Sequence, residues 1–197
     1  MTGTLTAEIA AAAARLIVEE GLEYGPAKRR AARDLRSGAR SVDLPGNDAV
    51  EDEVRSYIDC FHADSQPAEL AALRSVAATW MAQLEAFRPY LTGAVWRGTA
   101  TRRSSIHIEL YCDDSKSAEL GLIDMRVDYD VSSTDGPRGK PLDVLNLVVR
   151  SPELAERVHV ALTVLDYDDV RGALRGDARG RPQRGDLAAL RALLAPS

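Results

Sequence analysis

The chain is poor in the residues that mark several classes of protein. It has two cysteines, Cys60 and Cys112, in 197 residues, and they form no Cys-x-x-Cys pair. The N-terminus lacks the basic segment of a secretory signal, so we expect two reduced thiols in a cytoplasmic protein rather than a disulfide framework. No stretch approaches the roughly 20 consecutive apolar residues that a membrane span needs. We therefore expect no membrane partner.

An excess of positive charge and the common ligand-binding motifs are missing too. The net charge is −5, so the chain as a whole is not attracted to nucleic acid or to anionic lipid. No glycine-rich loop ends in Gly-Lys-Thr or Gly-Lys-Ser, which excludes a P-loop nucleotide site. His62, His107 and His159 are scattered and indicate no catalytic triad. Together with Cys60 and Cys112 they match no standard zinc spacing, and we expect no cofactor.

The composition and pattern that are present predict an α+β protein. Hydrophobic residues make up 45% of the chain, which is enough for one domain with a core or one domain plus a small extension. The apolar spacing predicts helices at residues 6–21, 26–38, 47–61, 67–89, 118–125 and 186–194. Alternation predicts strands at residues 105–111, 126–131, 142–149 and 158–165, of which the last is apolar on both faces and therefore central. These elements suggest a helical region at 1–66, a mixed sheet flanked by helices at 67–170, and an Arg/Gly-rich loop with a final helix at 171–197.

The most informative segment runs from residue 90 to residue 111. It predicts a strand, a turn at Gly98-Thr99, a basic loop and a second strand. On the second strand, Ser105, His107 and Glu109 share one face, because side chains two residues apart point the same way.

This layout resembles the active-site hairpin of the polymerase-beta-type nucleotidyltransferases, and the resemblance covers about residues 67–166. In that family a Gly-Ser or Gly-Thr turn faces a phosphate, and the next strand carries two carboxylates that hold magnesium ions. The resemblance implies that Gly98-Thr99 is the phosphate-facing turn and that Arg102 and Arg103 form its positive rim. Ser105 and His107 then stand at the two carboxylate positions.

The two substitutions remove the chemistry that magnesium requires. Magnesium prefers anionic oxygen ligands, and a serine hydroxyl carries no charge. The imidazole of His107 suits zinc, copper or nickel better. Our leading hypothesis is a nucleotidyltransferase-like protein with a degenerate metal site, which binds a nucleotide, an RNA or a protein partner without transferring a nucleotidyl group.

Three other hypotheses remain open at this stage. In the first, Glu109 and Asp143, with Asp113 or Asp114, replace the usual ligands and hold magnesium in an active enzyme. In the second, the helical N-terminal region binds a protein partner and the sheet is a scaffold. In the third, the hairpin belongs to an unrelated α+β domain.

The N-terminal region also contains a cationic cluster in a segment that resembles bacterial nucleotidyltransferase-like proteins, Ala27-Lys-Arg-Arg-Ala-Ala32. The cluster consists of Lys28, Arg29, Arg30, Arg33 and Arg36. On a helix, Arg29, Arg33 and Arg36 share a face that can follow phosphates. The alternative is a solvated face balanced by acidic neighbours such as Glu19 and Glu20.

Overall fold

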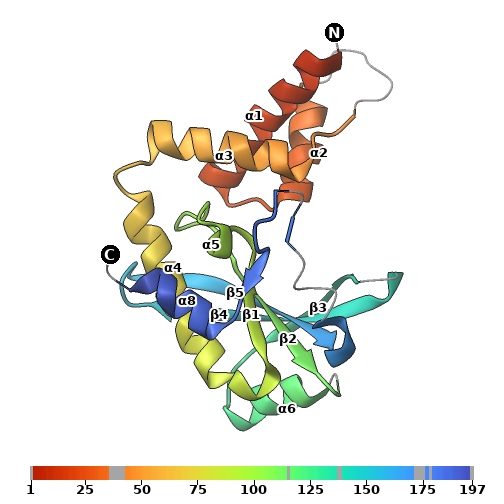
Figure 1. Ribbon diagram of the computed structural model, residues 1–197, viewed down its shortest axis with the longest axis vertical. Coiled ribbons are helices and arrows are strands. Elements are labelled where there is room, and N and C mark those ends of the chain that lie inside the picture. The colour runs from red at the N-terminus through yellow and green to blue at the C-terminus, as the bar shows by residue number, and fades with distance from the viewer. Residues whose placement is uncertain are drawn as a thin grey trace. The chain divides into compact units, whose positions relative to one another are not determined.

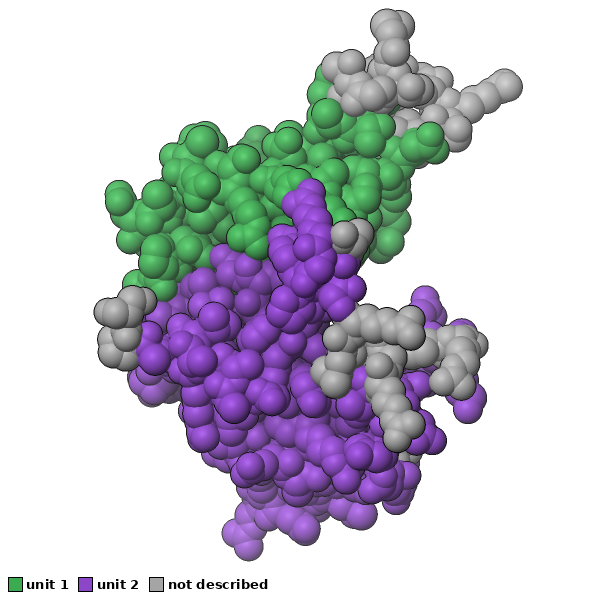
Figure 2. All heavy atoms as spheres, in the orientation of Figure 1, with its two compact units in different colours: residues 1–69, 99–104 green, residues 70–98, 105–197 purple. Residues whose placement is uncertain are grey.

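The computed structural model describes residues 2–35, 43–114, 116–136, 139–170, 176–177 and 179–195, with side chains from Leu5 onward. The chain divides into two compact units (Figure 2). Unit 1 comprises residues 1–69 and 99–104, and unit 2 comprises residues 70–98 and 105–197. The sequence placed the first boundary at residue 66. It did not anticipate that the short loop 99–104 groups with the helical region, or that the C-terminal segment groups with the sheet.

Unit 1 is helical (Figure 1). It contains α1 (Thr2–Glu20), α2 (Tyr24–Asp34), α3 (Asn47–Phe61) and the first turn of α4 (Gln66–Gln83). Its core lies where α1 contacts α2 and α3. Five alanines at most 3% exposed lie in this core: Ala10, Ala13, Ala14, Ala27 and Ala31. Small side chains allow the helix axes to approach closely. Gly21, with φ 71°, follows the end of α1 as the sequence predicted.

Unit 2 is built on a mixed sheet. Its strands are β1 (Pro89–Thr92), β2 (Ile106–Cys112), β3 (Asp130–Asp135), β4 (Pro141–Ser151), β5 (Glu156–Asp166) and β6 (Arg184–Gly185). Among the described residues the sheet has the order β3-β4-β5-β2-β1-β6. β2 and β5 are parallel, and the other neighbouring strands are antiparallel. β5 lies inside the sheet, which confirms the predicted central strand.

The helices of unit 2 are the rest of α4, α5 (Gly93–Arg97), α6 (Lys116–Asp124) and α8 (Leu187–Leu194), with the 3-10 turns η1 (Glu85–Phe87) and η3 (Tyr167–Asp169). α6 contacts β2, and α8 contacts β1 and β6. Asp186 caps α8, because its Oδ1 accepts a hydrogen bond of 2.8 Å from the backbone N–H of Ala189. These elements, together with unit 1, confirm the predicted α+β fold.

The register gives the sheet two different faces. Ile108, Leu162 and Leu145 lie beside one another on β2, β5 and β4 and are 0% exposed. We call their side of the sheet the buried face. His107 and Glu109 alternate with these residues and are partly exposed. We call their side the polar face, and it is the side on which the site is built.

Several predicted elements differ from the structure, among them the helix predicted at 67–89, which ends at Gln83. The strand before Gly98 is wrong, because β1 ends at Thr92 and residues 93–97 form α5. The strand predicted at 126–131 begins only at Asp130. Backbone N–H groups of Arg126 and Val127 close the end of α6, with Arg126 at φ 56°, so these residues end a helix instead of starting a strand. α1 begins at Thr2, earlier than the predicted residue 6.

The segment predicted as a loop at 171–185 contains a strand at its end, β6. Residues 171–175 and 178 of that segment lie outside the described part of the chain. Among the described residues, no helix combines the length and the apolar character that crossing a bilayer requires.

Candidate functional site

The candidate site is the polar face of β2. His107 and Glu109 lie on this face, and Ser105 directly precedes the strand. Tyr111 continues the same alternation and is 1% exposed. The three residues that the sequence grouped therefore extend from the start of β2 to its middle, with a buried tyrosine beyond them.

The charge of Glu109 is compensated by an arginine from the far end of the chain. The Nη1 of Arg184, on β6, donates to Glu109 Oε2 and, at 2.8 Å, to the hydroxyl oxygen of Tyr111. The Tyr111 hydroxyl in turn donates to Glu109 Oε2 at 2.7 Å. The side chains of Arg184 and Glu109 are each 18% exposed, so water screens this ion pair only partly.

The strand register explains how Arg184 reaches Glu109. Arg184 pairs with Thr92 of β1, and Thr92 pairs with His107 of β2. Paired residues point to the same side of a sheet. Arg184 therefore lies on the polar face and extends across β1 to the strand beyond it.

Tyr111 acts in this network as a neutral hydroxyl. Burial raises the pKa of Tyr111 above its usual value, and the adjacent carboxylate of Glu109 raises this pKa further. The phenol therefore keeps its proton at neutral pH and donates it to the carboxylate.

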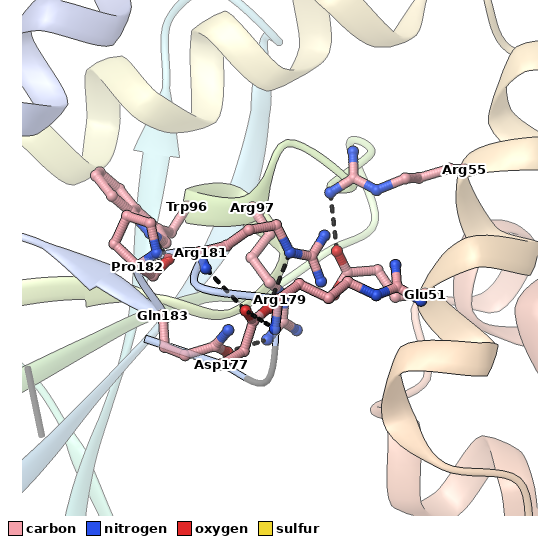
Figure 3. A network of polar contacts seen from close by, with 9 residues as sticks. All are labelled: Glu51, Arg55, Trp96, Arg97, Asp177, Arg179, Arg181, Pro182 and Gln183. Atoms are coloured by element: carbon pink, nitrogen blue, oxygen red, sulfur yellow. Dashed lines mark hydrogen bonds and ion pairs between the residues drawn. The ribbon is translucent and has the colours of Figure 1, made fainter. Parts of the chain in front are cut away.

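The chain on either side of Arg184 is anchored on α5. The indole Nε1 of Trp96 donates to the carbonyl oxygen of Pro182 at 2.8 Å (Figure 3). Gly185 lies against the same ring, and a Cβ atom at this position would come within 2.1 Å of Trp96. We call residues 182–185 the strap. Arg184, Gly185 and the carbonyl group of Pro182 all make their contacts within unit 2.

A tight turn leads into the strap. Asp177 Oδ1 accepts hydrogen bonds from the backbone N–H groups of Arg179 and Arg181, at 2.9 and 2.8 Å, and its Oδ2 accepts one from Arg181 Nε. Figure 3 shows these contacts beside Trp96 and Pro182. The backbone hydrogen bond from Arg181 is the main cause that lowers the pKa of Asp177. The Asp177 carboxylate therefore stays ionised to lower pH than an ordinary aspartate.

The predicted phosphate-facing turn has different surroundings from those expected. Gly98, with φ 82°, follows the last residue of α5, so it terminates a helix. Arg74 donates to the carbonyl oxygens of Val95 and Trp96 at this end, at 3.2 and 3.3 Å. A helix C-terminus presents carbonyl groups and attracts cations rather than phosphate. Thr99 is only 2% exposed.

Arg102 and Arg103 are exposed, but they lie in the loop that groups with unit 1. The backbone N–H of Arg102 donates to Glu69 at 2.9 Å. The carbonyl oxygen of Arg103 lies so close to Gly21 that a Cβ atom there would come within 2.4 Å of it. The loop is thus built into unit 1, while the polar face of β2 belongs to unit 2.

The replacement metal ligands do not come together. Glu109 and Val144 both pair with Thr163, so the side chain of Asp143, next to Val144, points to the opposite side of the sheet from Glu109. The register thus places these two carboxylates on opposite sides of the sheet. Among the described residues, no group of three or more His, Cys, Asp or Glu side chains is arranged to hold a metal ion.

Asp143 instead lines a cavity of about 750 Å³ where β2 and β5 end. Six aspartates line it, together with Lys140: Asp113, Asp114, Asp143, Asp166, Asp168 and Asp169. Three of these carboxylates have roles in the local structure. Asp114 and Asp166 accept hydrogen bonds from the backbone N–H groups of Lys116 and Asp168, and Asp113 lies 3.8 Å from Arg88. So acidic a lining repels phosphate groups.

The cationic cluster of α2 is partly used for internal contacts. Lys28 Nζ donates to Asn47 at 2.8 Å and to the carbonyl oxygen of Pro45 at 3.1 Å. Arg30 pairs with Glu20, as expected for a balanced helix surface. Arg29 and Arg33 are exposed and share a face of the helix. Arg36, the fifth residue of the cluster, lies outside the described residues.

Sequence reasoning missed Arg184, Tyr111 and Trp96. Tyr111 could have been included, because it follows Glu109 at the same two-residue spacing. Arg184 carried no such signal, since it lies 75 residues from Glu109 in a segment without apolar periodicity. Comparison with protein-family models, with curated proteins and with solved structures finds no match to this chain.

Proposed function

We propose that this chain is a nucleotidyltransferase-like protein that binds a phosphate-bearing ligand, a nucleotide or an RNA, and transfers no nucleotidyl group. The observation that carries the proposal is the ion pair between Glu109 and Arg184 on the polar face of β2. Glu109 is the anionic side chain that β2 contributes to this face, and its charge is already neutralised.

The charges on the polar face of β2 support the proposal that the protein transfers no nucleotidyl group. Two-metal catalysis uses anionic ligands that hold two divalent ions about 4 Å apart. Here the corresponding positions carry the hydroxyl of Ser105 and the imidazole of His107. Freeing Glu109 for a metal ion would break its ion pair with Arg184. The loss of that partly buried pair opposes metal binding.

The ligand class is supported by charge in unit 1. Arg29 and Arg33 on α2 and Arg102 and Arg103 in the loop are exposed, and arginine is well suited to phosphate oxygens. A protein partner has less support. Among the described side chains of unit 1, the exposed large hydrophobic residues are Leu44 and Phe61. Two such residues are fewer than an extended apolar contact surface needs.

The first experiment tests transfer directly. The purified protein is incubated with each nucleoside triphosphate and with Mg²⁺ or Mn²⁺, and released pyrophosphate is measured. We expect release at the rate of the protein-free control. Pyrophosphate release that depends on the metal ion and on Glu109 would refute the proposal.

The second experiment tests binding. Fluorescence anisotropy of a labelled nucleotide and of a short labelled RNA is measured in EDTA at two salt concentrations. We expect binding without metal, and a weaker affinity at the higher salt concentration. The double variant Arg29→Ala/Arg33→Ala should weaken it about tenfold, whereas Arg191→Ala, which removes an exposed arginine of α8 in unit 2, should not. Equal affinity for both variants would contradict this part of the proposal.

A further inference from the structure

The strap is held by little regular structure. Its strand, β6, consists of Arg184 and Gly185, which pair with Thr92 and Leu91 of β1. Strands of globular proteins are usually about five or six residues long. A two-residue strand forms few hydrogen bonds with its neighbour, so side-chain contacts must supply most of what retains the strap.

Three side-chain contacts do so. The middle one is weak, because Arg97 Nη1 donates to Gln183 Oε1 at 3.4 Å, and the other two lie at opposite ends of the strap. At one end, the indole of Trp96 binds the carbonyl oxygen of Pro182. At the other end, Arg184 binds the carboxylate of Glu109 and the hydroxyl of Tyr111. The ion pair is the stronger type of contact, because a hydrogen bond between charged groups exceeds one between neutral groups.

The closed arrangement also contains an unfavourable feature. The Nε of Arg184 is buried and has no hydrogen-bond partner among the described residues. A buried N–H group without a partner loses its bond to water and gains nothing in return. Arg184 therefore both stabilises the closed state, through its ion pair with Glu109, and destabilises it, through its unpaired Nε. This reduces the difference in free energy between the closed state and an open one.

From these three features we propose that the strap opens and closes at the polar face of β2, with the Glu109–Arg184 ion pair as its latch. In the closed state Arg184 neutralises Glu109 and occupies the space across β1. In the open state Glu109 and Tyr111 are released beside His107. The opening itself follows from the contacts of unit 2 alone. Only its role in controlling a ligand site rests on the proposed function.

Trp96 provides a direct reporter of this motion. The chain has two tryptophans, Trp80 and Trp96, so a Trp80→Phe background leaves the indole that contacts the strap. In that background, Arg184→Ala should raise the acrylamide quenching constant of Trp96 at least twofold. Arg191→Ala removes an exposed arginine of the adjacent helix α8 and should leave quenching unchanged.

Hydrogen exchange distinguishes opening from general loosening. In Arg184→Ala, the backbone amides of residues 184–185 should exchange at least tenfold faster, while those of β5 should change less than twofold. Glu109→Gln removes the other half of the latch with little change in shape. It should raise quenching by a similar factor, and the double variant should show no further increase.

Three results would overturn the latch. The first is unchanged Trp96 quenching and exchange in both folded single variants. The second is an equal rise of exchange in β5, which would make Arg184 an ordinary support of the sheet. The third is an additive effect of the two substitutions, which would show that the two residues act separately. Neither the quenching nor the exchange measurement contains nucleotide or metal, so their outcome is separate from that of the transfer assay.

Discussion

The two units of this protein are organised by different kinds of contact. Unit 1 is built from helices that follow one another in the chain and pack through an alanine-rich core. The polar face of unit 2 contains a contact between residues 75 positions apart, Glu109 and Arg184. The contrast shows that local periodicity specifies a scaffold, whereas the chemistry of a site is set by long-range pairing. The predictions below test this difference, from the largest expected effect to the smallest.

The largest effect is expected in the core of unit 2. Leu162 of β5 is 0% exposed, and Leu162→Ala should lower the free energy of unfolding of this unit by about 2–5 kcal/mol, because it leaves a cavity. Urea denaturation monitored by tryptophan fluorescence measures it, since both tryptophans lie in unit 2. Leu120→Ala is the matched control: Leu120 is 58% exposed, and the change should be within about 0.5 kcal/mol. Equal losses for the two variants would show that the buried face does not form the core.

The next effect is expected where the end of α1 packs against the loop 99–104 in unit 1. Gly21 has φ 71°, and a Cβ atom there would come within 2.4 Å of the Arg103 carbonyl oxygen. Gly21→Ala should therefore destabilise unit 1 by more than about 1 kcal/mol. Helical circular dichroism during thermal unfolding provides the measurement. Gly46 has φ −61° and no atom near its Cβ position, so Gly46→Ala should cost only the weaker preference for alanine at the N-cap of α3, and less than Gly21→Ala. A stable Gly21→Ala protein would argue against the close packing of the loop.

The smallest effect is a dependence on alkaline pH in unit 2. Burial and Glu109 raise the pKa of Tyr111 in the folded protein, whereas a tyrosine in the unfolded chain has a pKa of about 10. Below pH 10 both states keep the proton, and the stabilisation is fully present. Above pH 10 the unfolded state loses its proton first, so stability falls by about 1 kcal/mol between pH 10 and 11.

Tyr111→Phe isolates this pH dependence, because it removes the ionisable group. Its loss of stability between pH 10 and 11 should be smaller than that of the natural chain, as measured by urea denaturation at each pH. Tyr167→Phe is the comparison, since Tyr167 is 44% exposed. If both variants show the same alkaline slope, Tyr111 is not held protonated by its surroundings.

Much of the scaffold could be predicted because its signals are local. The helix ending at Gly21 and the central strand β5 follow from apolar spacing within short windows. The errors arose where the local signal was too short or ambiguous. α5 has five residues, too few for a helical repeat to be visible. Arg126 and Val127 alternate as a strand would, but the end of α6 uses their backbone N–H groups.

Whether Glu109 and Asp143 lie on the same face of the sheet could be decided only from the register of the strands. The sequence allowed Glu109 and Asp143 to converge, because it contains no information on which face of β4 points toward which face of β2. The pairing of both strands with β5 places these carboxylates on opposite sides. A shift of one residue would have reversed that result, since every side chain of a strand changes face with its register.

The sequence by itself determined that His107 and Glu109 share a face and that no second carboxylate accompanies Glu109, because alternation along a strand is a property of the backbone. Only the tertiary structure decided that Arg184 neutralises Glu109 and that Tyr111 donates to it. Those contacts require β6 to pair beside β1, and such a pairing joins segments that are remote in the chain.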